Sequence, residues 1–207
     1  MNVPKRKRSV IAFTDALCRL LCDTPLKKLS VTSICSEAGY TPMAFYSSFQ
    51  NKNDFAYSVV DYEAQVFASC VYDQLEQFST GENKIMLHRQ YITDYFEHVS
   101  ENRKLFHCIL NNQLMPDGIA LLSKRIAHYM CTYMTLRSEA YPEMENFTAF
   151  VLEITAAQML MVVRYWLGKA SAMEPQTAAE LYCDQFLFRS TVSFEQDPES
   201  GTFYASL

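Results

Sequence analysis

The chain has 207 residues, of which 49% are hydrophobic and 20% charged, so it can bury a sizeable core and does not have the composition of a disordered chain. Only five glycines and seven prolines interrupt it, which favours helices over a many-turned β protein. The net charge is −5, but the first 52 residues carry +5 and the remainder −10. A basic end on an acidic body suits a small anion-binding module attached to a body with another task.

Targeting signals and metal motifs are not apparent in the sequence. No apolar run approaches the roughly 18–20 residues that span a bilayer, and the N-terminus lacks the pattern of a signal peptide. The four histidines (His88, His98, His107 and His128) lack metal-ligand spacing. The seven cysteines lie in apolar stripes without paired CxxC spacing: Cys18, Cys22, Cys35, Cys70, Cys108, Cys131 and Cys183. We therefore expect free, mostly buried thiols in a reducing cytoplasm, no metal or other cofactor, and no membrane partner.

The first two helices are short. Hydrophobic residues recur every three or four positions over about residues 8–22, which predicts an amphipathic helix that Asp23-Thr24-Pro25 ends. A second helix is expected over 31–38, because Ser30 can cap its N-terminus. Gly39 then permits the left-handed backbone that a tight turn between helices needs.

A third helix begins at Thr41-Pro42, a hydroxyl at the cap followed by proline at the first helical position, and is expected to end near Phe49. Asn51 caps a long fourth helix that reaches to about Phe78. Further helices are expected over 83–99, 102–111, 116–137, 146–168 and 176–190. The prediction is thus an all-α protein of about nine helices, with residues 191–207 as a loose tail.

The segment from Ser30 to Phe55 carries an ordered motif: Ser-Val-x-x-Ile, then Ala-Gly before the turn, then Phe-Tyr-x-x-Phe-x-Asn-Lys-x-x-Phe. It closely resembles the DNA-binding segment of the TetR family of transcription regulators, and the resemblance is strong over about residues 8–60. Cys35 stands where the family has a small alanine and Tyr40 where a small aliphatic is common; neither removes a DNA-contacting group. The resemblance implies a helix-turn-helix domain at 1–51 and a helical effector-binding and dimerisation domain at 52–190.

A helix that enters the major groove needs a narrow N-terminal turn, which Thr41, Pro42, Met43 and Ala44 provide. Met43 and Ala44 offer apolar contact to thymine methyls rather than base-reading hydrogen bonds. The other predicted contacts are hydroxyls and a cation for phosphate oxygens: Thr32, Ser33, Thr41, Tyr46, Ser47, Ser48 and Lys52. For Tyr46 the alternative is a local packing role, and for Lys52 a solvated surface position. Residues 5–8 form either an arm that follows DNA or a frayed terminus.

The C-terminal half supplies a candidate dimer surface, which one small helix-turn-helix needs in order to bind DNA specifically. Apolar residues recur at helical spacing over 146–168, and a second apolar helix follows at 176–190. The family implies that these helices form a four-helix bundle with a second copy, and the interface residues expected are Phe150, Ile154, Met161, Tyr165 and Phe186. The alternative is that the stripe serves the core of one subunit.

Aromatic and methionine side chains in the middle of the chain suit a small hydrophobic effector. The residues predicted to line its pocket are Tyr91, Tyr95, Tyr129, Tyr133, Met159 and Trp166. An aromatic stripe at helical spacing also fits a plain core, and both interpretations stay open.

The sequence thus predicts a homodimeric regulator, a repressor, that binds double-stranded operator DNA under the control of a small hydrophobic ligand. An enzyme is the rival from another class, but no phosphate-binding, dinucleotide, nucleophile-elbow or zinc-protease motif is present, and no catalytic residue is predicted. A ligand-binding or adaptor protein that has lost specific DNA binding is the second rival, because the tip of the third helix lacks a base-reading arginine or asparagine.

Overall fold

The computed structural model describes residues 5–77, 84–135, 145–170, 172–187, 193–196 and 203–206. Up to residue 187 the described elements are all helical, as predicted, and every helix except the last follows its expected range to within a few residues. In chain order the elements are α1 (Arg8–Leu20), the 3₁₀ turn η1 (Leu26–Lys28), α2 (Val31–Ala38), α3 (Pro42–Tyr46), α4 (Lys52–Gln77), α5 (Lys84–Glu101), α6 (Arg103–Leu110), α7 (Gly118–Thr135), α8 (Glu145–Lys169), α9 (Pro175–Tyr182), the π-helical turn η4 (Cys183–Leu187), β1 (Ser193–Gln196) and β2 (Phe203–Ser206).

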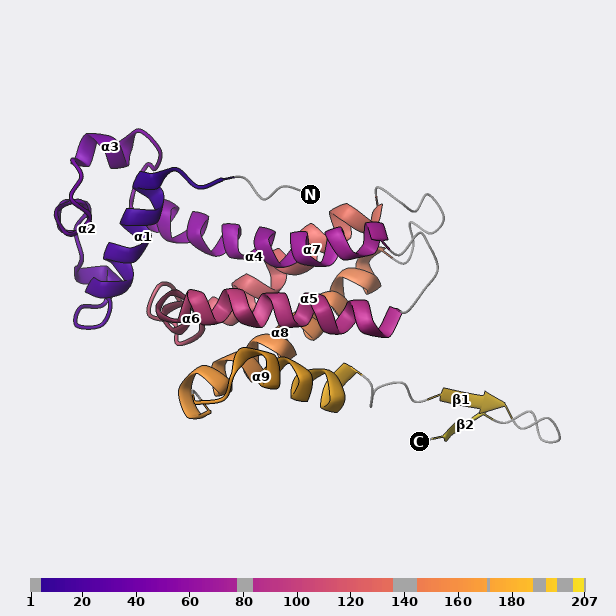
Figure 1. Ribbon diagram of the computed structural model, residues 1–207. Coiled ribbons are helices and arrows are strands. Elements are labelled where there is room, and N and C mark those ends of the chain that lie inside the picture. Colours follow the sequence, from indigo (N-terminus) through magenta and orange to yellow (C-terminus); the bar gives the residue numbers. More distant parts are fainter. Residues whose placement is uncertain are drawn as a thin grey trace.

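Residues 8–51, with α1, α2 and α3, form a small unit at one end of the molecule, which we call the head (Figure 1). Local sequence explains its short helices. The amide of Ser33 donates to the Ser30 hydroxyl at 3.0 Å, and the amide of Ser30 donates to the Ser33 hydroxyl at 3.1 Å, so the start of α2 is capped reciprocally. Gly39 ends α2 with a φ of 72°, a backbone conformation that costs a residue with a Cβ.

An aromatic cluster holds the head together and joins it to α4. The ring of Phe45 in α3 is fully buried, and its centroid lies 5.4 Å from that of Phe13 in α1 and 5.4 Å from that of Phe55 in α4, both edge-on. Phe49, predicted inside α3, follows it in an irregular turn but still packs against Phe45 at 5.3 Å. α3 is therefore fixed mainly by Phe45, with Ala44 half-buried against the same core, while Met43 and Tyr46 are turned outward.

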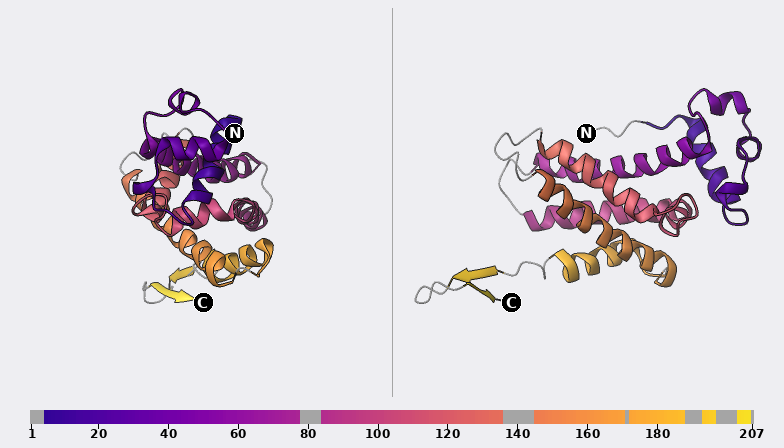
Figure 2. Two further views of the ribbon diagram at one scale, coloured as in Figure 1. Left: turned by 90° about the vertical axis from the view of Figure 1, so that its left-hand side faces the viewer. Right: turned by 180° about the vertical axis from the view of Figure 1, so that it is seen from behind.

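The remaining helices, α4 to α9, form the body (Figures 1 and 2). α4 runs from the head along the body, where α7 packs against it, and α8 packs against α7. α9 packs mainly on α5, so its buried residues Ala178, Ala179 and Tyr182 serve the core of the subunit itself. Gly118 is required where α7 meets α6, because a Cβ there would lie 2.0 Å from the carbonyl oxygen of Ile109.

A polar cluster fastens α4 to α7. Arg125 Nε donates to Asp61 Oδ1 at 2.5 Å, and the Tyr129 hydroxyl donates to Asp61 Oδ2 at 2.8 Å. Gln65 Nε2, one turn after Asp61 on α4, donates to the same tyrosine oxygen at 2.9 Å. These charge-assisted, half-buried hydrogen bonds set the register of one long helix against the other.

The C-terminal region differs from the prediction. The helix expected over 176–190 is shorter: α9 ends at Tyr182 and continues as the π turn η4. The loose tail expected after residue 191 contains two short antiparallel strands, in which Ser193 pairs with Ser206 and Gln196 with Phe203. These strands contain residues that the sequence shows as isolated aromatics: Phe194, Phe203 and Tyr204. Strand pairing depends on a partner segment elsewhere in the chain, so it leaves little local signal in the sequence.

The aromatic cluster generates a stability prediction. Phe45→Ala leaves a cavity between α1, α3 and α4, so we expect it to lower the free energy of unfolding by about 3–5 kcal/mol. Urea unfolding followed by helical circular dichroism at one protein concentration measures this. Met43→Ala, on the exposed face of the same helix, is the matched control and should leave the midpoint unchanged; equal midpoints for the two variants would contradict the assigned packing.

Candidate functional site

The α2–α3 pair presents an unusual surface at the far end of the head. The Met43 side chain is 83% exposed and the Tyr46 side chain 56%, although both belong to a helix held by a buried phenylalanine. Thr32, Thr41, Pro42, Ser47 and Ser48 are exposed around them, and Ser33 and Ala44 are half-buried. The predicted DNA-contacting residues of α2 and α3 therefore lie together on one small unit. The inward face of that unit is already packed against the aromatic cluster.

The hydroxyl groups of this surface differ in whether they already form hydrogen bonds within the protein. The Thr41 oxygen accepts the Ala44 amide at 3.4 Å, so its own proton is available to an outside acceptor. Ser47 donates its proton to the Ala44 carbonyl and Ser33 donates its proton to the Ser30 carbonyl, both at 2.8 Å.

The other three hydroxyls are better placed to bind a partner. Within the described part of the chain, those of Thr32, Tyr46 and Ser48 have no hydrogen-bond partner. These are the strongest candidates for donation to phosphate oxygens.

Cations surround the same unit. Arg19 is engaged with Glu37, its Nε donating to the carboxylate at 2.6 Å. The remaining basic side chains of the N-terminal region that lie exposed are Lys5, Lys7, Arg8, Lys27 and Lys28. Lys27 and Lys28 belong to η1, which precedes α2 in the head, a position that the sequence offers only as part of a charge count. They join the candidate phosphate contacts because they are exposed on the same small unit as Thr32.

Lys52 has a different role from the one predicted. Its ammonium donates to three backbone carbonyls, those of Leu26 at 2.8 Å, Lys27 at 3.1 Å and Leu29 at 2.7 Å. An ammonium has three protons, and all three are matched here. Lys52 thus ties the η1 turn to the start of α4 and has a structural role that the sequence did not predict. The direct phosphate contact stays a prediction, and these three bonds argue against it.

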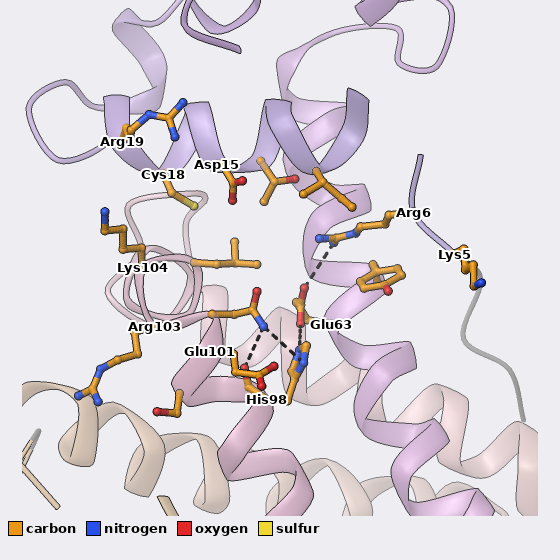
Figure 3. Close-up of a pocket in the computed structure, with 16 residues that line it drawn as sticks. Lys5, Arg6, Asp15, Cys18, Arg19, Glu63, His98, Glu101, Arg103 and Lys104 are labelled. Atoms are coloured by element: carbon orange, nitrogen blue, oxygen red, sulfur yellow. Dashed lines mark hydrogen bonds and ion pairs between the residues drawn. The ribbon is translucent and has the colours of Figure 1, made fainter. Parts of the chain in front are cut away.

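The N-terminal segment is held against the body through Arg6. Its guanidinium donates to the Val59 carbonyl at 3.2 Å, lies 3.4 Å from the Glu63 carboxylate and stacks 3.7 Å from the Tyr62 ring centroid (Figure 3). Glu63 is 1% exposed and also contacts His98 Nε2 at 2.7 Å. Burial lowers the pKa of the Arg6 guanidinium and the Glu63 charge opposes that shift. Arg6 therefore belongs to the body, which leaves Lys5, Lys7 and Arg8 on the solvent side.

A small apolar cavity lies inside the body. It measures about 80 Å³ and is lined from α4, α5, α7, α8 and α9 by Phe67, Tyr91, Ile92, Ile126, Met130, Leu152, Thr155, Ala156, Met159 and Tyr182. Burial raises the pKa of Tyr182 to about 12 and also raises that of Tyr91, so both hydroxyls are protonated at neutral pH. Among the described residues, no group of three or more His, Cys, Asp or Glu is placed to hold a metal ion.

Two of the six residues predicted for an effector pocket, Tyr91 and Met159, line this cavity. Tyr95 and Trp166 are core residues instead: Tyr95 is fully buried, and Trp166 Nε1 donates to the Met173 carbonyl at 3.0 Å. Tyr129 belongs to the α4–α7 polar cluster, and the Tyr133 side chain lies outside the described residues. The aliphatic lining was missed because it has the same spacing as ordinary core.

The outer face of α8 is apolar and exposed. Phe150 is 59% exposed, Ile154 51%, Met161 55% and Tyr165 66%, and these four positions fall on one side of the helix. The opposite side, with Met159, Leu160, Val163 and Trp166, is buried. The stripe thus serves the core of the subunit and also leaves a second apolar face uncovered. The side chain of Phe186, predicted beside them, lies outside the described residues.

This exposed face makes α8 apolar enough to cross a membrane by length and composition alone. The stretch Ala149–Lys169 has a mean hydropathy of 1.4, and 28% of it is buried inside the structure. The sequence shows no unbroken run of spanning length, because Glu153 and Arg164 interrupt it.

No family model matches this sequence, and no curated protein matches it. Solved structures do. A TetR-family transcriptional regulator of Syntrophomonas wolfei is 10% identical with a TM-score of 0.62, covering 87% of this chain and 93% of its own. NalD of Pseudomonas aeruginosa, the secondary repressor of the MexAB-OprM multidrug efflux pump, is 16% identical with a TM-score of 0.59, covering 89% and 97%. FadR of Bacillus subtilis in complex with stearoyl-CoA is 11% identical with a TM-score of 0.57, covering 84% and 95%. The chain has the fold of the TetR-type regulators, and the resemblance found in the sequence is confirmed at the level of the fold.

The structural role of Lys52 is testable. Lys52→Met keeps the aliphatic stem but leaves three carbonyls without their donor, so we expect the free energy of unfolding to fall by about 1–3 kcal/mol. Lys28→Met, two residues before the cap of α2 and exposed, should change it by less than about 0.5 kcal/mol. Urea unfolding midpoints of the two variants, measured side by side, test this role. An unchanged midpoint for Lys52→Met would contradict a stabilising role for its three hydrogen bonds.

Proposed function

We propose that this protein is a TetR-type transcription regulator that binds operator DNA as a homodimer, as a repressor whose affinity responds to a small apolar ligand. The observation that carries the proposal is the α2–α3 pair, a rigid helix-turn-helix that presents Met43 and Tyr46 to solvent at the end of the molecule. The repressor role is supported by the NalD likeness.

The head is suited to phosphates more than to base edges. The head carries unpartnered hydroxyls on Thr32, Tyr46 and Ser48 and exposed ammonium groups on Lys27 and Lys28. Phosphate contacts of this kind supply affinity and register, whereas the apolar tip formed by Met43 reads thymine methyls weakly. We therefore expect specificity to depend on two half-sites read together.

The second half-site requires a second copy of the chain, and the exposed face of α8 is its proposed contact. Phe150, Ile154, Met161 and Tyr165 form a continuous apolar strip that water would otherwise cover. A strip on one helix suits a two-fold interface, in which the same residues of both copies meet. Burial in such an interface also explains the high hydropathy of α8 in a protein we expect in the cytoplasm. α9 contributes less than the family pattern implies, because it is packed on α5.

The cavity lined by Tyr91 and Met159 is the proposed effector site. Its 80 Å³ is below the roughly 300–1,000 Å³ of ligand pockets, so an effector must open it. Met130 and Met159 are flexible enough to move aside. The stearoyl-CoA complex of the FadR likeness supports an aliphatic ligand class. A ligand here displaces α7, and α7 is fastened to α4 through Arg125 and Asp61.

The DNA-binding surface predicts a specific salt response. On a fragment carrying the operator, the affinity of the reduced wild-type protein should fall steeply as salt rises. Lys28→Ala removes two phosphate contacts from a dimer, so the slope of log K against log salt should become shallower by about 2. Tyr46→Phe removes one hydroxyl per head and should weaken binding about tenfold without changing stability.

Gel retardation and fluorescence anisotropy at several salt concentrations measure both effects. Asp23→Ala, an exposed acid at the end of α1, is the matched control and should bind no more weakly than the wild type. Wild-type protein that prefers no upstream fragment would instead favour the adaptor alternative, and unchanged affinity for both variants would overturn the assigned contacts.

The dimer contact is tested by charge. Ile154→Asp places two carboxylates in the proposed interface, so the protein should become monomeric at micromolar concentration and lose specific DNA binding while keeping its helicity. Ile11→Asp is the matched control, since Ile11 is an isoleucine of similar exposure, 46%, on α1. Light scattering after gel filtration gives the masses; a dimer that survives Ile154→Asp would remove α8 from the interface.

A larger side chain in the wall of the cavity tests the proposed effector site. Ala156→Leu adds three carbons to the wall of the cavity, so we expect it to abolish the thermal stabilisation given by medium-chain fatty acids and by stearoyl-CoA, and to leave DNA affinity intact. Thermal shift assays with and without each lipid measure this, and Thr177→Leu, at an exposed position of α9 that does not line the cavity, is the control. Ligand responses equal to wild type would place the effector elsewhere.

A further inference from the structure

The basic segment before α1, residues 5–7, lies along the body and is directed away from the α2–α3 surface. We call this segment the arm. It leaves the start of α1 with an extended backbone and runs beside α4, away from α3 (Figure 1). Arg6 contacts α4 at Val59 and Glu63, about two to three turns after the helix begins at Lys52. At about 1.5 Å of rise per residue, the guanidinium is bound roughly 10–16 Å along α4.

Three groups of α4 bind the Arg6 guanidinium. It donates to the Val59 carbonyl at 3.2 Å and lies 3.7 Å from the centroid of the Tyr62 ring. Its third partner is Glu63 Oε1 at 3.4 Å, on a carboxylate that is 1% exposed. A carbonyl, an aromatic face and a buried carboxylate together suit a planar cation. The Arg6 side chain is only 13% exposed here, so it anchors the arm to the body.

The Glu63 carboxylate does not depend on Arg6 as its sole partner. Its other oxygen, Oε2, lies 2.7 Å from Nε2 of His98 on α5, a shorter contact than the one with Arg6 (Figure 3). Glu63 therefore keeps a hydrogen bond when Arg6 leaves. Burial also disfavours the charged guanidinium, which lowers its pKa and offsets part of the attraction. Because Arg6 lines a groove of about 790 Å³ rather than packed core, its docking is reversible.

We propose that the arm has two alternative partners: the Arg6 site on α4 in the free protein, and the phosphate backbone beside the head in the operator complex. This inference rests on the proposed DNA-binding function. Lys5 and Arg6 cannot serve both partners, because a docked Arg6 holds them along the body. Three extended residues span about 10 Å, so a released arm can swing about the start of α1 toward a duplex. Cations that reach phosphates strengthen binding, so the docking of Arg6 restrains operator affinity.

Docking of the arm is measured without DNA by phenylglyoxal, which modifies accessible guanidinium groups, followed by peptide mass spectrometry. In the wild-type protein Arg6 should react several times more slowly than Arg8, which is exposed at the start of α1. Glu63→Gln removes the charge opposite Arg6 while keeping the side-chain volume and a possible hydrogen bond to His98. The reaction rate of Arg6 in this variant should approach that of Arg8, because the guanidinium has lost its carboxylate partner.

The effect on DNA binding is measured on the operator fragment at several salt concentrations. Lys5→Gln/Arg6→Gln should make the slope of log K against log salt shallower by up to about 4, because a dimer loses two cations from each arm. Glu63→Gln should raise affinity about tenfold, since the arm no longer has to leave its site on α4. The same substitution in the Lys5→Gln/Arg6→Gln background should give no gain. Glu101→Gln, an exposed acid of the same groove, is the matched control and should change affinity less than about twofold.

Three outcomes overturn the proposal: equal phenylglyoxal reactivity of Arg6 and Arg8 in the wild-type protein, a salt slope unaffected by Lys5→Gln/Arg6→Gln, or the same change of affinity by Glu63→Gln in both backgrounds. The last would mean that Glu63 acts on DNA binding without the arm. If Glu63→Gln fails to fold, Tyr62→Leu removes the aromatic face instead and should raise affinity about threefold. Absent operator binding by the wild type and every variant marks failure of the proposed function, while phenylglyoxal still reports whether the arm is docked.

Discussion

The packing of Phe45 between Phe13 and Phe55 is the contact on which the proposed function depends. α3 is only five residues long, too short to be stable alone, so its position is set by this buried ring and by the turn at Gly39. The same ring packs α3 directly against α4 across the turn at residues 47–51. We propose that a rotation of α4 is passed through this contact to the surface that presents Met43.

Two polar contacts connect the head, α4 and α7. Lys52 ties the start of α4 to the carbonyls of η1, so the head and the first turn of α4 are one rigid piece. About two and a half turns further along, Asp61 fastens α4 to α7 through Arg125, and α7 forms one wall of the apolar cavity. A ligand changes DNA affinity only if it binds two arrangements of the helices with different affinity. We propose that an aliphatic ligand moves α7, because the cavity of about 80 Å³ is smaller than such a ligand.

The sequence was most informative where the interactions are local. Helix ends follow from Ser30 and Gly39, whose capping chemistry involves residues three or four positions away, and the all-helical fold was predicted on that basis. Side chains whose partners lie far away in the chain were predicted less well. Lys52 meets carbonyls more than twenty residues earlier, and Tyr129 meets Asp61 across 68 positions. Neither hydrophobic periodicity nor motif spacing carries such information, and the cavity lining is indistinguishable from core for the same reason.

The central claim is that two heads grip one DNA duplex at symmetric half-sites. Hydroxyl-radical footprinting of the reduced protein on its upstream region tests this most directly. The account predicts two protected patches related by a two-fold axis, on one face of the duplex and spaced by a whole number of helical turns of about 10–10.5 base pairs. A single unpaired patch, or protection with no preference for position along the fragment, would contradict it.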